Sequence, residues 1–266
     1  MPTRGGRLRG GYAPASIRNF GDRIGVAENT AAVEYGCLDH CLRGDLKEHA
    51  QRAMAVLRPI KLTIINYPEG ESETFEVENN PNDPEAGTRP VTFSRNLYVE
   101  SDDFLETPIP KYKRLYPDGP ECRLKGAYLI KCTGCVKDEQ GNVVEILATY
   151  DPDSKGGNPA DGRKVKGATI HWVDAETAVD AQVRLYDNLF ADENPDGGDK
   201  DFLDCLNPGS LEVLEGCKLE ASLANAQPSD RFQFLRLGYF CADSKDSKPG
   251  ALVFNRAVSL KDGFKK

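Results

Sequence analysis

Residues 123–131 (RLKGAYLIK) and 143–150 (VVEILATY) flank a turn-forming stretch, residues 138–142 (DEQGN). Both flanking stretches contain the β-branched, aromatic and alternating residues that strands favour, and the Gly-Asn pair between them favours a reversal of the chain. This part of the sequence therefore predicts an antiparallel β-hairpin.

The same period of two recurs on both sides of this hairpin. Upstream, residues 61–67 and 74–78 are typical of two strands joined by a turn. Downstream, shorter strands are predicted at residues 168–173, 182–186, 211–214, 231–235, 238–241 and 252–259. Many short strands separated by turn residues indicate antiparallel barrels or sandwiches, and they argue against a parallel nucleotide-binding sheet.

Helical periodicity is confined to the first fifth of the chain. Ile17, Phe20 and Ile24 recur at a spacing that places them on one face of a helix, and Gly25 is a favourable residue for its C-terminal end. Asn29-Thr30 offers an N-cap for a second helix, whose apolar residues continue to near Ala50. We therefore expect a helical hairpin ahead of the strands.

The composition is that of a globular protein, since 39% of the 266 residues are hydrophobic and 29% are charged. No apolar run approaches the roughly 20 residues that a membrane-spanning helix needs. Residues 1–12 lack the apolar segment of a signal peptide, and the eight cysteines have no regular spacing, which is typical of a reducing compartment. We expect a cytoplasmic protein that does not contact a membrane.

The formal net charge is −8, but the charges are unevenly distributed. Residues 69–106 are rich in Asp and Glu, whereas residues 108–137, called the basic strip below, carry seven Lys or Arg against two acidic residues. Cations neutralise phosphate, and an interleaved ring such as that of Tyr112 can stack on a base. The basic strip is therefore a candidate surface for RNA.

Motifs of nucleotide chemistry are missing from the sequence. Neither a phosphate-binding loop ending in Lys-Ser or Lys-Thr nor a GxGxxG turn occurs in it. A nucleophilic cysteine requires a neighbouring base and an orienting group, and the sequence alone does not show that any of its three histidines serves a thiol as that base. We expect no catalytic residues in this chain.

Two cysteine patterns could indicate a metal. Cys132 and Cys135 form a single CxxC pair, whereas a structural zinc site usually needs two such pairs. Cys37, His40 and Cys41 lie on one expected helix, among apolar neighbours that favour a place in the core. We expect no metal site from either pattern.

Short motifs spread in order over the whole chain carry the strongest signal. They include Arg23-Ile-Gly, Arg52-Ala-Met-Ala-Val, Ile64-Ile-Asn-Tyr67, Asn80-Pro-Asn-Asp-Pro-Glu, Gly162-Arg-Lys-Val-Lys-Gly, Ile170-His-Trp-Val, Arg184-Leu-Tyr-Asp-Asn-Leu-Phe, Gly238-Tyr-Phe-Cys and Val253-Phe-Asn-Arg. Together they resemble the glutaminyl-tRNA synthetases, which are class I aminoacyl-tRNA synthetases.

This resemblance implies a fold and a domain organisation. Residues 1–50 correspond to the family's α-helical subdomain at the end of the catalytic half, and residues 51–266 correspond to its anticodon-binding region. That region consists of two antiparallel β-barrels. The expected ranges are 51–107 with 228–266 for the proximal barrel and 108–227 for the distal barrel. We therefore expect a mainly β protein with a short N-terminal α-helical subdomain.

The resemblance also implies residues that read the anticodon. Arg52 and Gln233 correspond to residues that contact the central uridine. Lys113 and Arg114 correspond to a Lys-Arg pair at the third base, and Arg123 corresponds to an arginine at the first base.

Further positions line the same surface in this comparison. Lys125 stands where some relatives have a second arginine, and lysine keeps the charge but cannot form the paired hydrogen bonds of a guanidinium. The remaining candidates for anticodon binding are Asn82, Lys111, Arg236 and Lys261.

The family implies tRNA(Gln) as the partner, bound mainly through its anticodon loop, with no DNA bound and with the protein as a monomer. The full-length enzyme is a ligase that joins glutamine to tRNA(Gln) with ATP and Mg²⁺. Its ATP-binding motifs are absent here, so we expect this chain to hold no cofactor and to be inactive alone. Two alternatives remain open, namely the anticodon-binding region of a glutamyl-tRNA synthetase and a stand-alone, non-catalytic RNA-binding module.

Overall fold

The computed structural model describes residues 6, 9–25, 35–192, 197 and 201–261. Two helices, α2 (Pro14–Ile24) and α3 (Tyr35–His49), pack against each other ahead of all the strands. Gly25 ends α2 with a φ of 67°, a left-handed value that glycine adopts without strain. The predicted helical hairpin is confirmed, while the N-cap expected at Asn29-Thr30 lies outside the described residues.

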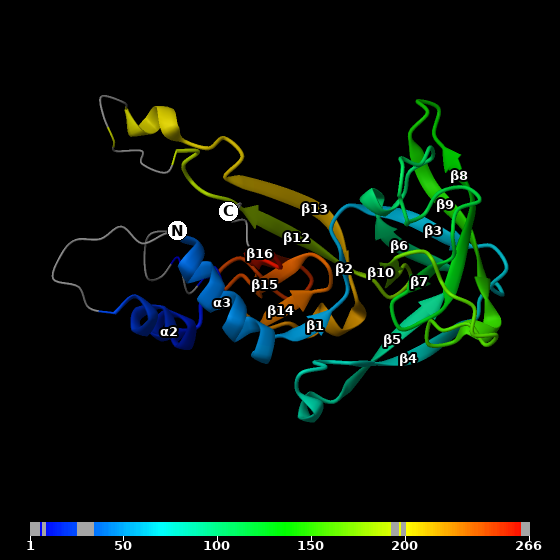
Figure 1. The fold of residues 1–266 in the computed structure, drawn as a ribbon, viewed down its shortest axis with the longest axis horizontal. Coiled ribbons are helices and arrows are strands. Elements are labelled where there is room, and N and C mark those ends of the chain that lie inside the picture. The colour runs from blue at the N-terminus through cyan, green and yellow to red at the C-terminus, as the bar shows by residue number, and fades with distance from the viewer. Residues whose placement is uncertain (1–5, 7–8, 26–34, 193–196, 198–200, 262–266) are drawn as a thin grey trace.

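Two barrel-like sheets follow the helices (Figure 1). The first sheet has the order β1-β14-β15-β16-β12-β13-β2. Its strands are β1 (Gln51–Ala53), β2 (Ala55–Val56), β12 (Val179–Tyr186), β13 (Leu211–Leu219), β14 (Arg231–Phe234), β15 (Gly238–Ala242) and β16 (Leu252–Ser259). Its two edge strands are separated in sequence only by Met54, so the ends of the sheet are drawn together.

The second sheet has the order β10-β7-β8-β9-β3-β6-β11. Its strands are β3 (Pro59–Ile64), β6 (Asn96–Glu100), β7 (Cys122–Leu124), β8 (Leu129–Lys137), β9 (Val143–Asp151), β10 (Thr169–Ile170) and β11 (Val173–Asp174). Only His171 and Trp172 separate its edge strands, so this sheet also curls on itself. A two-stranded ribbon, β4 (Ser72–Glu78) with β5 (Thr88–Ser94), packs beside it (Figure 1). Short 3₁₀ turns connect these strands, at Pro84–Ala86, Ser101–Asp103 (η2), Pro152–Ser154, Phe202–Cys205 and Ala221–Asn225 (η5).

The hairpin predicted from residues 123–150 is present, but its first strand is divided. Residues 123–131 do not form one strand, because the chain reverses around Gly126, whose φ is 75°. β7 therefore pairs in an antiparallel manner with the start of β8, and β8 pairs with β9 along its whole length, from Leu129 to Lys137. The glycine within an apparent strand was the local signal of this turn.

The mainly β fold with two barrel-like sheets is confirmed, but the sheets are mixed and not purely antiparallel. Parallel ladders join β1 to β14, β12 to β16, β7 to β10 and β3 to β9. These partners are distant in the sequence or separated by long loops, so no tight turn dictates an antiparallel direction.

The two sheets divide the chain differently from the expected barrel ranges of 51–107 with 228–266 and 108–227. Strands β3 and β6 belong with β9 and β11, and strands β12 and β13 belong with β16 and β2, because pairing between remote strands fixes the membership of each sheet. We propose residues 59–174 as the distal unit and residues 51–56 with 179–261 as the proximal unit. The helices lie against β14–β16 of the proximal unit (Figure 1).

Each sheet encloses its own apolar core. The second sheet surrounds Trp172 and Phe93, whose rings meet edge to face at 5.2 Å. The first sheet surrounds Phe234, Phe240 and Phe254. None of the helices in the described ranges is long and apolar enough to cross a membrane.

Candidate nucleic-acid interface

Arg52 and Gln233 form a pair on the first sheet. They are matched across the parallel strands β1 and β14, and their neighbours Ala53, Phe232 and Phe234 point into the core. The two polar side chains therefore lie on the opposite face of the sheet. Nε of Arg52 donates a hydrogen bond to Oε1 of Gln233 at 3.1 Å.

Asn82 lies in the loop between β4 and β5, next to this pair. The backbone N–H of Arg52 donates to the carbonyl oxygen of Asn79 at 2.7 Å, and Asn82 donates through Nδ2 to the carbonyl of Lys47 at 3.2 Å. The loop is held at the end of α3 by Asn80, which is buried and donates to the carbonyl of Glu48 at 2.8 Å. Asn82 is exposed at the junction of helix and sheet.

Lys261 follows β16 and is exposed. Ser259, two residues earlier, is paired with Gly238 at the start of β15, which is also where the turn between β14 and β15 ends. Lys261 therefore lies at the same end of the sheet as Arg236, which is in that turn.

Arg123 on β7 and Lys113 in the segment before β7 are held by one residue, Ala168. The N–H of Ala168 donates to the carbonyl of Lys113 at 2.7 Å, and the N–H of Arg123 donates to the carbonyl of Ala168 at 3.0 Å. Nε of Arg123 also donates to the carbonyl of Gly157 at 2.8 Å. The loop between β9 and β10 thus fixes both candidate residues.

Lys125 and Lys111 present exposed side chains from fixed backbone. The N–H of Lys125 donates to the carbonyl of Ile170 at 2.9 Å, and its own carbonyl accepts from Nε1 of the buried Trp172 at 3.1 Å. Lys111 lies in a turn with a φ of 66°, a conformation that costs a non-glycine residue roughly 1–2 kcal/mol.

Arg114 and Arg236 share one buried carboxylate. Asp103, 1% exposed at the end of η2, accepts from Nη1 of Arg236 at 2.6 Å and from its Nη2 at 2.7 Å. Nη1 of Arg114 lies 3.1 Å from Oδ1 of the same residue. The hydrogen bonds to Asp103 raise the pKa of Arg236. Arg236 has a φ of 70° in the turn that joins β14 to β15.

A second pair of polar residues supports Arg236 from behind. Nη1 of Arg236 lies 3.2 Å from Nδ1 of the buried His171, and arginine can only donate, so Nδ1 is the acceptor of this contact. Nε2 faces Oε1 of Glu100 at 3.5 Å. Burial alone would raise the pKa of Glu100, but His171 and the backbone N–H groups of Leu57 and Arg58 hold it below its usual value.

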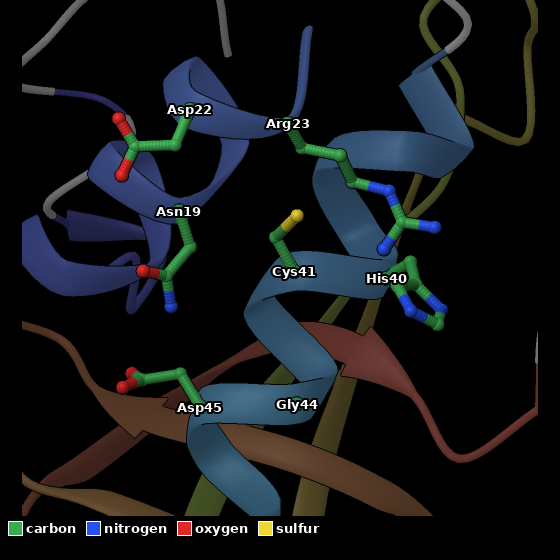
Figure 2. Close-up of a pocket in the computed structure, with 7 residues that line it drawn as sticks. All are labelled: Asn19, Asp22, Arg23, His40, Cys41, Gly44 and Asp45. Carbon is green, nitrogen blue, oxygen red and sulfur yellow. The ribbon is translucent and has the colours of Figure 1, made fainter.

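An open pocket and the cysteines are the features of the described residues that bear on catalysis or metal binding. An open pocket lies between α2 and α3; α2 contributes Asn19, Asp22 and Arg23, and α3 contributes His40, Cys41, Gly44 and Asp45 (Figure 2). Burial is the main cause that raises the pKa of Cys41, and it raises that of Cys132 to about 11, so both thiols stay protonated and poorly nucleophilic. Within the described ranges, no three His, Cys, Asp or Glu residues are grouped to hold a metal ion.

Two comparisons with known proteins bear on this surface. Residues 50–151 match the model for the anticodon-binding domain of class I tRNA synthetases (E and Q), and residues 169–243 match a second model with the same description. The chain belongs to this family. Its two matched segments together contain the basic strip, the buried Asp103 and the β14–β15 turn.

The relatives of this anticodon-binding region carry the name glutamine–tRNA ligase. The protein of Clostridium kluyveri is 52% identical over 266 residues, which cover 100% of this chain and 47% of that protein. The protein of Pseudomonas putida is 52% identical over 99% of this chain and 46% of its own length. The chain thus spans about half the length of these curated relatives and is homologous to their C-terminal part, which confirms the resemblance inferred from the motifs.

The candidate anticodon residues fall into two groups. Arg52, Asn82, Gln233, Arg236 and Lys261 surround one end of the first sheet. The second group consists of Arg123 on β7 of the second sheet, Lys125 in the turn after β7, and Lys111, Lys113 and Arg114 in the segment between η2 and β7. Asp103 connects the two groups through its contacts with Arg236 and Arg114. The roles of Asp103, Glu100 and His171 were not identified from the sequence. Asp103 belongs to an acidic stretch with no distinguishing local pattern, and its two arginine partners are 11 and 133 positions away.

Proposed function

We propose that this anticodon-binding region selects tRNA(Gln) by reading the bases of its anticodon loop. In the full-length protein it would serve a cytoplasmic, monomeric ligase that joins glutamine to this tRNA with ATP and Mg²⁺. The observation that carries the proposal is the direct pairing of Arg52 with Gln233 beside a basic strip whose arginines are already oriented by buried partners.

The chemistry of the Arg52–Gln233 pair fits a central uridine. The hydrogen bond from Arg52 uses one lone pair of Oε1 and leaves the second lone pair for an N–H of the base. The amide nitrogen of Gln233 and the terminal nitrogens of Arg52 are donors for the carbonyl oxygens of uracil. Cytosine has an amino group where uracil has one of these oxygens, so it would bring donor against donor.

Arg114, Lys113 and Arg123 fit the other two anticodon bases. The carbonyl of Gly157 accepts a hydrogen bond from Nε of Arg123 only. Among the described residues, the structure gives the two terminal nitrogens of Arg123 no hydrogen-bond partner. A guanidinium oriented in this way can form two parallel hydrogen bonds with a base edge. Arg114 presents the same chemistry near the third base, where Lys113 adds charge for the phosphates.

ATP and Mg²⁺ belong to the proposal only for the full-length enzyme. The ATP-binding motifs of class I synthetases are missing from this sequence, so we assign neither ATP nor Mg²⁺ to its own residues. The role proposed for this chain's own residues is recognition alone.

The third anticodon base provides the sharpest test. Glutamine and glutamate codons differ at their first base, which pairs with guanine in tRNA(Gln) and with cytosine in tRNA(Glu). Binding of the chain to anticodon stem-loops that differ only at this base should favour guanine, and Arg114→Ala should remove the preference. Equal affinity of the wild-type chain for both loops would overturn the proposal, and preference for cytosine would indicate a glutamyl-tRNA synthetase.

A further inference from the structure

We infer that Asp103 is a positioning residue that couples the reading of the third anticodon base to the reading of the central base. This inference rests on the function proposed above. Asp103 contacts no base in the proposal. It would act through Arg114 on one side and Arg236 on the other, because its single carboxylate accepts two hydrogen bonds from Arg236 and forms an ion pair with Arg114 at 3.1 Å.

The Arg114 side of this connection is short and well ordered. The backbone carbonyl of Asp103 accepts the N–H of Leu115 at 3.0 Å, and the N–H of Leu105 donates back to the carbonyl of Leu115 at 3.1 Å. Arg114 also donates through Nη1 to the carbonyl of Asp102 at 3.2 Å. The guanidinium of Arg114 is therefore oriented by the η2 turn, so a base that draws Arg114 outward must pull on this turn.

The Arg236 side of this connection leads to Arg52 and Gln233, the two residues proposed to read the central base. Arg236 lies three residues after Gln233, in a turn closed by a hydrogen bond from the N–H of Leu237 to the carbonyl of Phe234 at 3.0 Å. The N–H of Leu235 donates to the carbonyl of Ala53, the residue after Arg52, at 3.0 Å. A displacement of Arg236 would therefore move the backbone that holds both members of the pair.

The carboxylate itself ties the two sides together. Oδ1 of Asp103 accepts a hydrogen bond from Nη2 of Arg236 at 2.7 Å, and Nη1 of Arg114 forms an ion pair with the same oxygen at 3.1 Å. A carboxylate that is 1% exposed needs its cationic partners, because water cannot replace them. If a base draws Arg114 away, the charge of Asp103 is left to Arg236 alone, and the bidentate contact becomes tighter.

The test is a cycle of base changes with four anticodon stem-loops, which are native, altered at the third base, altered at the central base, and altered at both. For the wild-type chain we expect the Kd of the doubly altered loop to differ about fivefold from the value obtained by multiplying the two single effects. This is a typical coupling between sites in one network. For Asp103→Asn, which keeps the size of the side chain but removes its charge, we expect the two effects to multiply. The matched control is Asp180→Asn, which removes a carboxylate that is 73% exposed on β12 and should leave the non-additivity unchanged.

The outcomes separate the inference from the proposed function. If the wild-type chain prefers neither the native third base nor the native central base, the proposed function is wrong. Intact preferences that multiply independently in the wild type, or equal coupling in wild type and Asp103→Asn, would overturn the inference alone. If circular dichroism shows that Asp103→Asn does not fold, Arg236→Lys replaces it, since lysine keeps the charge and loses the bidentate contact. Coupling equal to that of the wild type in Arg236→Lys would likewise overturn the inference.

Discussion

Arg52 and Gln233 lie opposite each other on parallel strands, and Nε of Arg52 donates to Oε1 of Gln233 at 3.1 Å. These residues are 181 positions apart in the chain, so pairing of β1 with β14 is what creates this recognition element. The amide orientation of Gln233 follows from the contact, because an arginine can meet only the oxygen.

Gln233→Glu tests this orientation. The carboxylate should pair more strongly with Arg52 but lacks the amide donor, so discrimination of uridine from cytosine at the central base should fall by about 1–3 kcal/mol. The measurement is the affinity for stem-loops that differ at this base. Gln140→Glu, in the exposed turn before β9, adds the same charge and should leave discrimination unchanged. Retained discrimination in Gln233→Glu would show that the amide does not meet the base.

Lys125→Ala tests the difference between phosphate and base contacts. A lysine that contacts phosphate should weaken every loop alike and lower the slope of log affinity against log salt by about 0.7. Titrations at several salt concentrations give the slope. Lys137→Ala is the matched control, because Lys137 is already paired with Glu106 at 2.7 Å and lies outside the matched anticodon positions. An unchanged slope in Lys125→Ala would exclude a phosphate contact.

Glu220→Ala tests the buried ion pair between β5 and η5. Glu220 is 3% exposed, accepts from Nη2 of Arg89 at 3.0 Å and also accepts the N–H of Met54 at 2.8 Å. Its removal leaves a buried guanidinium unpaired, so the free energy of unfolding should fall by about 3–5 kcal/mol. Urea unfolding measures this loss.

Glu212→Ala provides the matched control for that experiment. Its partner Arg58 is 44% exposed and Glu212 is 52% exposed, although their atoms approach to 2.7 Å. An exposed pair of this kind contributes about 0–1 kcal/mol. Comparable losses in the two variants would contradict the distinction drawn from burial.

Asp243 should make the stability of the first sheet sensitive to acid. Burial alone would raise the pKa of Asp243, but hydrogen bonds from Arg9 at 2.7 Å and from Asn255 at 2.6 Å, with backbone N–H groups, hold it far below its usual value. A lowered pKa in the folded state stabilises the protein above the unfolded value of about 3.9, and this contribution is lost as the pH falls towards the folded value.

Unfolding in urea from pH 7 to pH 3 measures this contribution. The difference in stability between the wild type and Asp243→Asn should be constant between pH 7 and about pH 5 and should narrow below about pH 4. A difference that stays the same down to pH 3 would show that the charge of Asp243 is not what stabilises this contact.

Local structure could be read from the sequence where the signal is local. The strands 143–150 and 74–78 were predicted within a residue or two of β9 and β4, because alternation and turn residues act over a few positions. The parallel direction of β3 and β9 could not be read in this way. Their pairing depends on which surfaces are buried together, and neither segment records its partner.

The candidate site also contains residues that the sequence indicates and residues that only the packing of remote segments reveals. Arg114 and Arg123 were identified through motifs that resemble a family, and the chain's own chemistry supports them as cations near an aromatic ring. Asp103 gives no such signal, because a carboxylate in an acidic stretch is usually solvated. Its significance comes from being 1% exposed between two arginines, which only the packing of two sheets produces.

The membership of the two sheets also sets an order of events during synthesis. The second sheet uses one continuous stretch, residues 59–174, so all its strands are synthesised before β12. β1 and β2 emerge earlier than that stretch, yet their partners β14 and β13 come near the end of the chain. The nascent chain therefore carries a complete distal unit and two unpaired segments for the time needed to add about 60 residues, roughly 3–12 s at ordinary elongation rates. The Arg52–Gln233 pair is among the last features of the molecule to form.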